Sequence, residues 1–345
     1  MNMCERIQYW DNLKGVLIFL VVFAHFLLKS EQYHVRILVD AIYMFHMPAF
    51  VFISGFFGKS EHSRSSSSIL KLLAAYILFN GLSSIIFNNY SVLVPFQIYW
   101  YILALIVYRL SIPWIAQFKG CLVVLTTISI LIGYSNEINS NFGLSSIILF
   151  APFYLAGYLM SIKNAKNGMI CKSCRRIVLG LLAIELAVLI GLISYNIMDI
   201  VGEMVGVAIG RCCLILISVL AIYGLGTFIP NRTIPLLSRF GKYSLSIYLF
   251  HIFHLYFQRN VCFDNEYLLI LVAFLLSIVT CILLSLPFIA RMTDKLLSAG
   301  ANLLKGNKEP GYYPLVVKTL FCGIGVLFLL HQPILRIIDY MLSLP

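Results

Sequence analysis

The sequence predicts an all-α integral membrane protein: a polytopic helical bundle of about 10–11 transmembrane helices with its N-terminus in the cytoplasm. Three observations predict this class. Of the 345 residues, 61% are hydrophobic and 11% are charged, whereas a soluble globular domain has about 25% charged residues. The apolar residues form consecutive segments close to membrane-spanning length. Lys and Arg gather in alternate loops between these segments, as they do on the cytoplasmic side of a membrane.

The apolar segments define the expected spans in order. They are Leu13–Leu28, Ala41–Phe57, Ile69–Phe87, Phe96–Ile112, Cys121–Tyr134, Leu144–Ile162, Ile177–Tyr195, Val205–Phe228, Tyr243–Phe257, Tyr267–Ala290 and Pro314–Leu330. The segments at 121–134 and 243–257 are short for a full crossing, so each either spans or re-enters. Residues 291–313 mix cations with leucines at helical spacing and are expected to lie along the inner membrane surface.

No polar stretch is long enough to fold separately. We therefore expect one transmembrane domain over residues 1–345. Its core covers about residues 6–290, and residues 291–345 add the interfacial segment and an extra helix.

The formal charge of +11 indicates orientation in a membrane and not a nucleic-acid partner. With the N-terminus inside, 20 of the 25 Lys and Arg residues lie in inner loops or at inner helix ends. The others are Lys29, Arg36, Arg259 and Arg336 outside and Arg211 within a span. This excess predicts a multi-pass membrane protein with its N-terminus in the cytoplasm and membrane lipids as neighbours. We expect the membrane to be a cell (cytoplasmic) membrane, of bacterial origin.

The cysteines and the first span exclude other classes. Asp11 and Asn12 interrupt the start of the first span, and more spans follow it, so it is not expected to be a cleaved signal. Cys171 and Cys174 form a C-x-x-C pair without a second pair at metal-binding spacing. Free thiols are therefore favoured over a zinc or redox site, and no metal is expected.

The first span carries a lysine and, eleven residues later, a histidine in the run WDNLKGVLIFLVVFAHFLL. Eleven helical steps return to nearly the same angle, so Lys14 and His25 share one helix face about 16 Å apart. An ionisable group inside a membrane helix indicates a functional site. The alternatives are that Lys14 reaches lipid phosphates or pairs with Asp11, and that His25 only satisfies a backbone carbonyl.

His25 is suited to act as a general base, because apolar surroundings favour the neutral imidazole that can accept a proton. His46 lies in the second span, two residues before Pro48, which removes one backbone donor. If the first two helices run antiparallel, both histidines lie in the outer half and face one cavity. Alternatively, His46 satisfies polar groups near Pro48.

Further polar and aromatic groups lie in or beside later spans. His251 lies on a segment that offers no carboxylate beside it, which disfavours a metal site. Trp100 and Tyr101 stand at the outer end of a span, where an aromatic belt is expected. Glu185 and Arg211 each need a buried partner, which is either the other or another group.

The chain resembles the acyltransferase 3 family, especially its fucose 4-O-acetylase-like sugar O-acetyltransferases. The stretches that carry the resemblance, in family order, are RIQYWDNLKGVLIFLVVFAHF, FHMPAFVFISGFF, YWYILALIVYRL, LFAPFYLAGYLM and FGKYSLSIYLFHIF. The first is the most specific: the family signature has a basic residue, ten intervening residues and a histidine. Lys14 and His25 occupy these places, where many relatives have Arg first.

The resemblance implies transfer of an acyl group, usually acetyl from cytosolic acetyl-CoA, to a sugar hydroxyl of a surface or exported polysaccharide. The acceptor is then a glycan or a lipid-linked sugar. The expected site residues are His25, Lys14 and His46 for catalysis, Lys14, Lys59, Arg64 and Lys71 for the donor, and Asp11, Trp100, Tyr101 and His251 for the acceptor.

This chain also departs from the family pattern. Relatives often carry arginines near the start of the third span, where it has only Arg64 and Lys71, and an S-R pair where it has Ser145–Ser146. If those arginines bind the donor, other cations replace them here or the donor binds less tightly.

Two other classes of function fit a polytopic chain with a few buried ionisable groups. One is a transporter or flippase for a lipid-linked sugar, although transporters often have two related halves and this sequence has no internal repeat. The other is a non-catalytic membrane subunit of a polysaccharide synthase, in which Lys14 and His25 would tolerate substitution. We favour the acyltransferase.

Overall fold

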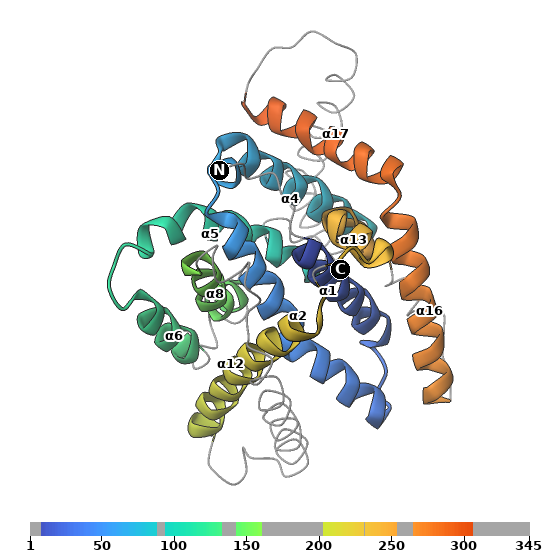
Figure 1. Ribbon diagram of the computed structural model, residues 1–345, viewed down its shortest axis with the longest axis horizontal. Helices are drawn as coiled ribbons and strands as arrows, with labels where there is room; N and C mark the ends of the chain where they lie inside the picture. The colour runs from blue at the N-terminus through green and yellow to red at the C-terminus, as the bar shows by residue number, and fades with distance from the viewer. Residues whose placement is uncertain are drawn as a thin grey trace, which may run out of the picture. The chain divides into compact units, whose positions relative to one another are not determined.

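A computed structural model describes residues 8–87, 94–132, 143–160, 203–230, 232–253 and 265–305 (Figure 1). Within these ranges the regular secondary structure is helical and contains no strand. The spans long and apolar enough to cross a membrane there are α1 (Gln8–Leu27), α2 (Tyr33–Gly58), α4 (Ser66–Ile86), η1 with α5 (Gln97–Ile115) and α16 (Glu266–Leu284). The protein is therefore an all-α polytopic membrane bundle, as the sequence predicted.

The chain divides into two compact units. The first comprises Met1–Phe57, Lys119–Ser135 and Ile148–Ala290, and the second Gly58–Phe118, Asn136–Ile147 and Arg291–Pro345. Besides α1, α2 and α16, the first unit holds α6 (Cys121–Leu131), most of α8 (Leu144–Leu159), α12 (Glu203–Phe228), α13 (Pro235–Lys242), α14 (Ser244–Phe250) and η3 (His251–Phe253). The second unit holds α3 (Glu61–Arg64), α4, η1 (Gln97–Tyr99), α5 (Trp100–Ile115) and most of α17 (Pro287–Lys305).

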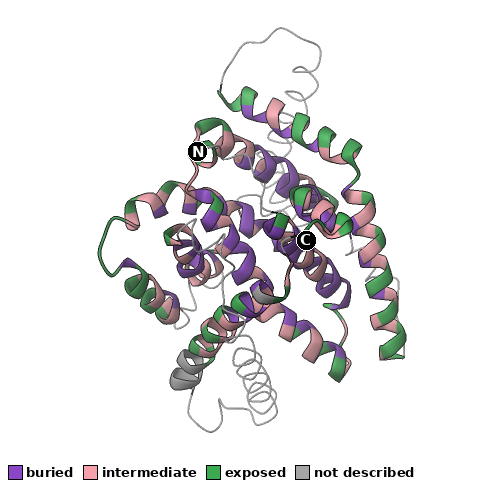
Figure 2. Ribbon diagram, in the orientation of Figure 1, coloured by how far each residue is buried: buried purple, intermediate pink, exposed green. Residues whose placement is uncertain are grey.

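Helix α1 forms the core of the first unit. In the 18-residue apolar stretch of α1, 72% of the residues are buried, whereas in that of α16 only 17% are buried. Figure 2 shows the same contrast between the two helices. It contacts α13, α14 and α16. It also runs antiparallel to α2, because Trp10 stacks on Phe56 while His25 contacts Tyr43. A group on α1 is thus enclosed by neighbouring helices, which is how a membrane protein removes polar side chains from lipid.

Reciprocal glycines let the helices of this unit approach closely. Gly15 of α1 faces the Leu237 carbonyl of α13, and Gly241 of α13 faces the Asp11 carbonyl of α1. A Cβ atom added at either glycine would overlap that oxygen. The same arrangement joins α2 to α8 through Gly55 and Gly157. In a bilayer, helices do not associate through the hydrophobic effect. Small residues at such crossings let the backbones approach, so that van der Waals packing holds the helices together.

Pro48 lies inside α2 and determines one interhelical hydrogen bond. A proline has no N–H group, so it leaves the carbonyl four residues earlier, that of Met44, without its helical donor. The Oγ of Ser218 in α12 lies 2.6 Å from the Met44 carbonyl oxygen and 2.6 Å from that of Leu214 in its own helix, so its one hydroxyl proton is shared between the two acceptors. The Met44 carbonyl, which lacks a helical donor because of Pro48, thus forms a contact that links α2 to α12.

Asn12 holds the segment before α13 against α1. Its Nδ2 donates to the carbonyl oxygens of Pro230 at 3.1 Å and Arg232 at 2.7 Å. Its Oδ1 accepts from Ser238 Oγ at 2.6 Å. The Asn12 side chain is completely buried, so these bonds are what make a polar side chain tolerable in this helix.

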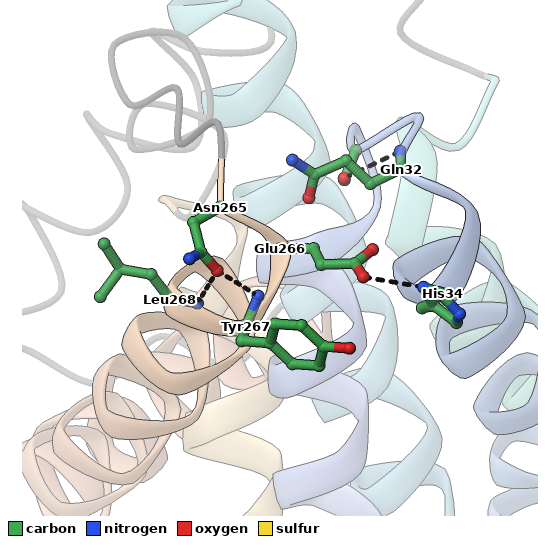
Figure 3. Close-up of polar contacts among 7 residues, drawn as sticks. Gln32, His34, Asn265, Glu266, Tyr267 and Leu268 are labelled. Carbon is green, nitrogen blue, oxygen red and sulfur yellow. Dashed lines mark hydrogen bonds and ion pairs between the residues drawn. The ribbon is translucent and has the colours of Figure 1, made fainter.

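Both ends of α16 are tied to other helices of the first unit. At its start, Asn265 caps the helix and Glu266 accepts a 2.7 Å bond from Nδ1 of His34, near the beginning of α2 (Figure 3). At its end, Arg239 of α13 donates to the Ser285 carbonyl at 3.2 Å. The C-terminal carbonyls of a helix need such external donors.

The second unit is organised around α4 and α5. Asn80 Oδ1 accepts from the Phe96 backbone N–H at 2.6 Å, which fixes the start of η1. Arg109 of α5 donates to Ser68 Oγ at 2.9 Å and to the Ser63 carbonyl at 3.1 Å. This guanidinium therefore lies beside the N-terminus of α4, where the Ser65 side chain also caps the helix.

The structure corrects several predicted boundaries. Helices α1 and α2 begin five and eight residues earlier than expected, because Asn12 and other polar residues there have partners in the protein. The expected span Tyr243–Phe257 breaks into the seven-residue α14 and η3 within its described part. The span Tyr267–Ala290 ends at Leu284, and Pro287 starts α17. The expected spans Ile177–Tyr195 and Pro314–Leu330 and the pair Cys171 and Cys174 lie outside the described residues.

Candidate active site

His25 is buried near the C-terminal end of α1, with 8% of its surface exposed. Its Nδ1 lies 2.7 Å from the carbonyl oxygen of Val21, one turn earlier in the same helix. A carbonyl oxygen only accepts, so Nδ1 is the donor and carries a proton. In the neutral ring, Nε2 is then the nitrogen that carries the basic lone pair, as a general base requires.

Five rings from α1, α2, α14 and η3 form a chain that includes His25. Successive ring centroids are 5.7 Å apart from Tyr248 to His251, 5.1 Å from His251 to His25, 5.8 Å from His25 to Tyr43 and 4.9 Å from Tyr43 to His46. The structure therefore brings together the three histidines that the sequence singled out. His46 and His251 are each 1% exposed, so they belong to the interior and not to the lipid-facing surface.

Lys14 lies toward the opposite end of α1 and is half-buried. Its Nζ is 4.0 Å from the centroid of the Phe57 ring at the end of α2, a cation–π contact. His25 contacts Tyr43 of the same helix, so Lys14 and His25 both face α2. Along α1 they are about 16 Å apart.

Aromatic residues that the sequence did not single out pack against Phe57, the ring that Lys14 contacts. Trp10 stacks on Phe56 with ring centroids 4.8 Å apart and meets the edge of Phe57 at 6.0 Å. The Nε1 group of Trp10 is buried and has no hydrogen-bond partner among the described residues. The spacing of Trp10 and Lys14, four residues apart in one helix, was the available signal, but their shared neighbours on α2 were not visible in the sequence.

The remaining predicted donor-binding residues belong to the second unit. Lys71 forms an ion pair with Asp294 of α17, Nζ to Oδ1 3.1 Å. Arg64 is exposed and lies near the Lys59 carbonyl at 3.4 Å. Partial burial lowers the pKa of Lys59 below its usual value of 10.5. These cations thus lie around the loop between α2 and α4, and Arg109 joins them there although no sequence pattern singles it out.

The predicted acceptor-binding residues are also distributed over both units. Asp11 is half-buried in α1, with its backbone carbonyl against Gly241. Trp100 and Tyr101 begin α5 in the second unit, where Tyr101 is buried. Arg211 donates to the Ser129 carbonyl at 3.3 Å, while Glu185 lies outside the described residues. Within the described residues, no group of three or more His, Cys, Asp and Glu could hold a metal ion.

The fold and this site define the class of protein. The described residues form a polytopic helical bundle in which α1 carries a buried imidazole and, at its other end, a half-buried lysine. The comparison with known families adds the class of reaction. The chain belongs to the acyltransferase 3 family: the family model described as an acyltransferase domain matches residues 7–286. It is therefore a membrane acyltransferase.

The match confirms the family that the sequence motifs indicated. The fucose 4-O-acetylase-like branch stays a prediction. No curated protein and no solved structure matches the chain.

Proposed function

We propose that this protein is an O-acetyltransferase that moves acetyl from cytosolic acetyl-CoA to a hydroxyl of a surface or exported polysaccharide or its lipid-linked sugar. The observation that carries the proposal is the buried imidazole of His25, whose Nδ1 donates to the Val21 carbonyl, in a chain of the acyltransferase 3 family. That bond leaves Nε2 as the base.

The reaction balances with His25 as the single proton carrier. Nε2 takes the proton of the sugar hydroxyl as the hydroxyl oxygen attacks the thioester carbonyl carbon. The tetrahedral intermediate collapses, the carbon–sulfur bond breaks, and the His25 imidazolium returns the proton to the leaving thiolate. The products are the O-acetyl ester and the free thiol of CoA.

Lys14 is proposed to hold a phosphate of the donor. A lysine is a point charge suited to phosphate, and its contact with Phe57 fixes the amine at one end of α1. The nucleotide end of the donor is then held about 16 Å from the base, which suits a ligand with a long, thin arm between its phosphates and its thioester. Lys59, Arg64 and Lys71 are proposed as additional donor cations, with the N-terminus of the chain in the cytoplasm and His46 beside the acceptor.

The test is acetyl transfer by purified protein in detergent or vesicles. Labelled acetyl-CoA is incubated with glycan extracts, and the label is located by mass spectrometry. We expect acetate on a sugar oxygen, and we expect His25→Ala to reduce the rate by about 10²–10⁴-fold. His62→Ala, at an exposed position of α3, is the matched control and should keep wild-type activity.

Two results would overturn the proposal. Full activity in a folded His25→Ala variant removes His25 as the base. Acetate found on a protein or lipid amine, or no transfer to any glycan, removes the proposed acceptor.

A further inference from the structure

The ring of a second histidine, His251, lies beside that of His25, with centroids 5.1 Å apart and planes inclined at 63°. The two residues lie far apart in the sequence, and their contact joins α1 to the short 3-10 turn that follows α14. Both side chains are buried, His251 almost completely. A close pair of buried imidazoles has no structural necessity, because two apolar rings would pack equally well.

Each ring of the pair is held by its own backbone. His251 Nδ1 lies 2.8 Å from the Tyr248 carbonyl oxygen, just as His25 Nδ1 lies 2.7 Å from that of Val21. Since carbonyl oxygens only accept, both Nδ1 atoms donate and both neutral rings have Nε2 as the basic nitrogen. Two bases of the same kind, fixed side by side, form a coupled pair.

A coupled pair of this kind accommodates one added proton. Two imidazolium ions at this separation in apolar surroundings would repel strongly, so protonation of one ring keeps the other neutral. A neutral imidazole beside an imidazolium stabilises it through its electron-rich ring and lone pair. Charge formed on His25 therefore has a neutral, polarisable neighbour at a fixed position.

Other groups near His25 fit this role less well. The described elements packed against α1 carry these titratable groups: Tyr33, His34, Arg36, Asp40, Tyr43 and His46 on α2, Arg239 and Lys242 on α13, Tyr248 and His251 on α14 and η3, and Glu266, Tyr267 and Cys281 on α16. The Tyr43 ring lies farther away, with its centroid 5.8 Å from that of His25. The His46 ring packs against Tyr43, with centroids 4.9 Å apart. On α16, Phe274 meets the edge of Phe23, and Glu266 is bonded to His34.

We infer that His251 is a positioning residue for His25: it holds the His25 ring in place and stabilises the imidazolium that forms when His25 takes the acceptor's proton. The inference rests on the proposed function, since it needs His25 to act as a base. His251 stays neutral throughout, and no proton leaves the pair other than the one that passes from the sugar hydroxyl to the thiolate.

The test is the pH dependence of kcat/KM for acetyl transfer in His251→Phe, which keeps a ring of similar size but has no ring nitrogen. We expect the acidic limb of the profile to move to lower pH by about one unit, a tenfold change in the proton affinity of His25. The KM for the acceptor should stay as in wild type. His62→Phe, exposed in the second unit, controls for the substitution.

A second variant keeps the test decisive if His251→Phe does not fold. His251→Asn retains a donor toward the Tyr248 carbonyl and should show the same movement of the limb. An unmoved limb in either folded variant overturns the inference, whether the rate falls uniformly or the acceptor KM rises. Failure of the proposed function is separate, because it appears as absent transfer in wild type or full transfer in His25→Ala.

Discussion

Gly15→Ala tests the close crossing of α1 and α13. The added Cβ would overlap the Leu237 carbonyl oxygen, which is backbone and has no flexible side chain to move aside. The helices must therefore separate, and overpacking of this kind costs about 2–3 kcal/mol. Alanine recovers up to about 1 kcal/mol in helix propensity. The net expectation is a loss of about 1–3 kcal/mol in the free energy of unfolding.

The matched control is Gly210→Ala in α12, where an added Cβ meets no atom within 4 Å. This variant should be neutral or more stable by up to about 1 kcal/mol. Thermal and denaturant unfolding in detergent, followed by tryptophan fluorescence, compares the two.

A further variant, Gly15→Ala with Gly241→Ala, places both methyl groups at the same crossing. Helices that have already separated accommodate the second methyl group, so the double variant should lose less than the sum of the single losses. Gly15→Ala as stable as Gly210→Ala would refute the close approach of α1 and α13.

Two more predictions concern buried polar groups. Asn12→Leu should lower the free energy of unfolding by about 2–4 kcal/mol, because two backbone carbonyls and a hydroxyl lose their partner. Asn12→Asp should not restore this stability, since a carboxylate cannot donate to carbonyls. Denaturant unfolding in detergent measures both variants. Ser218→Ala should cost about 1 kcal/mol, but in a Pro48→Ala background the same change should cost much less, because the introduced alanine supplies the Met44 carbonyl with a backbone N–H. A double-mutant cycle from thermal unfolding measures this difference, and strict additivity contradicts the assignment.

The spans with uniform apolar composition could be predicted from the sequence to within a few residues at their C-terminal ends. Their starts were misplaced where a polar side chain has a protein partner, as Asn12 does, since a hydropathy pattern cannot distinguish a satisfied amide from one exposed to lipid. The break at Pro287 had a sequence signal, because proline commonly begins a helix. The break at His251, inside the expected span Tyr243–Phe257, had no comparable signal.

The candidate site was predictable only in part. The positions of Lys14 and His25 on one helix follow from helical periodicity. The contact of His25 with His251, and of Lys14 with Phe57, depends on how distant segments pack, and one sequence contains no measure of that. The same holds for Arg109, whose place beside the start of α4 comes from the contact of α5 with α4.

The hydrogen bonds from the first two helices to α12 and the segment after it have a consequence for biosynthesis. The partners of Tyr9, Asn12 and the Met44 carbonyl are Gly226, Pro230 and Ser218, all made by the ribosome long after the groups that they meet. The first two helices therefore enter the bilayer before the hydrogen-bond partners of these polar groups have been synthesised. A nascent protein stopped before residue 218 would leave them exposed to lipid and become a substrate for membrane quality control.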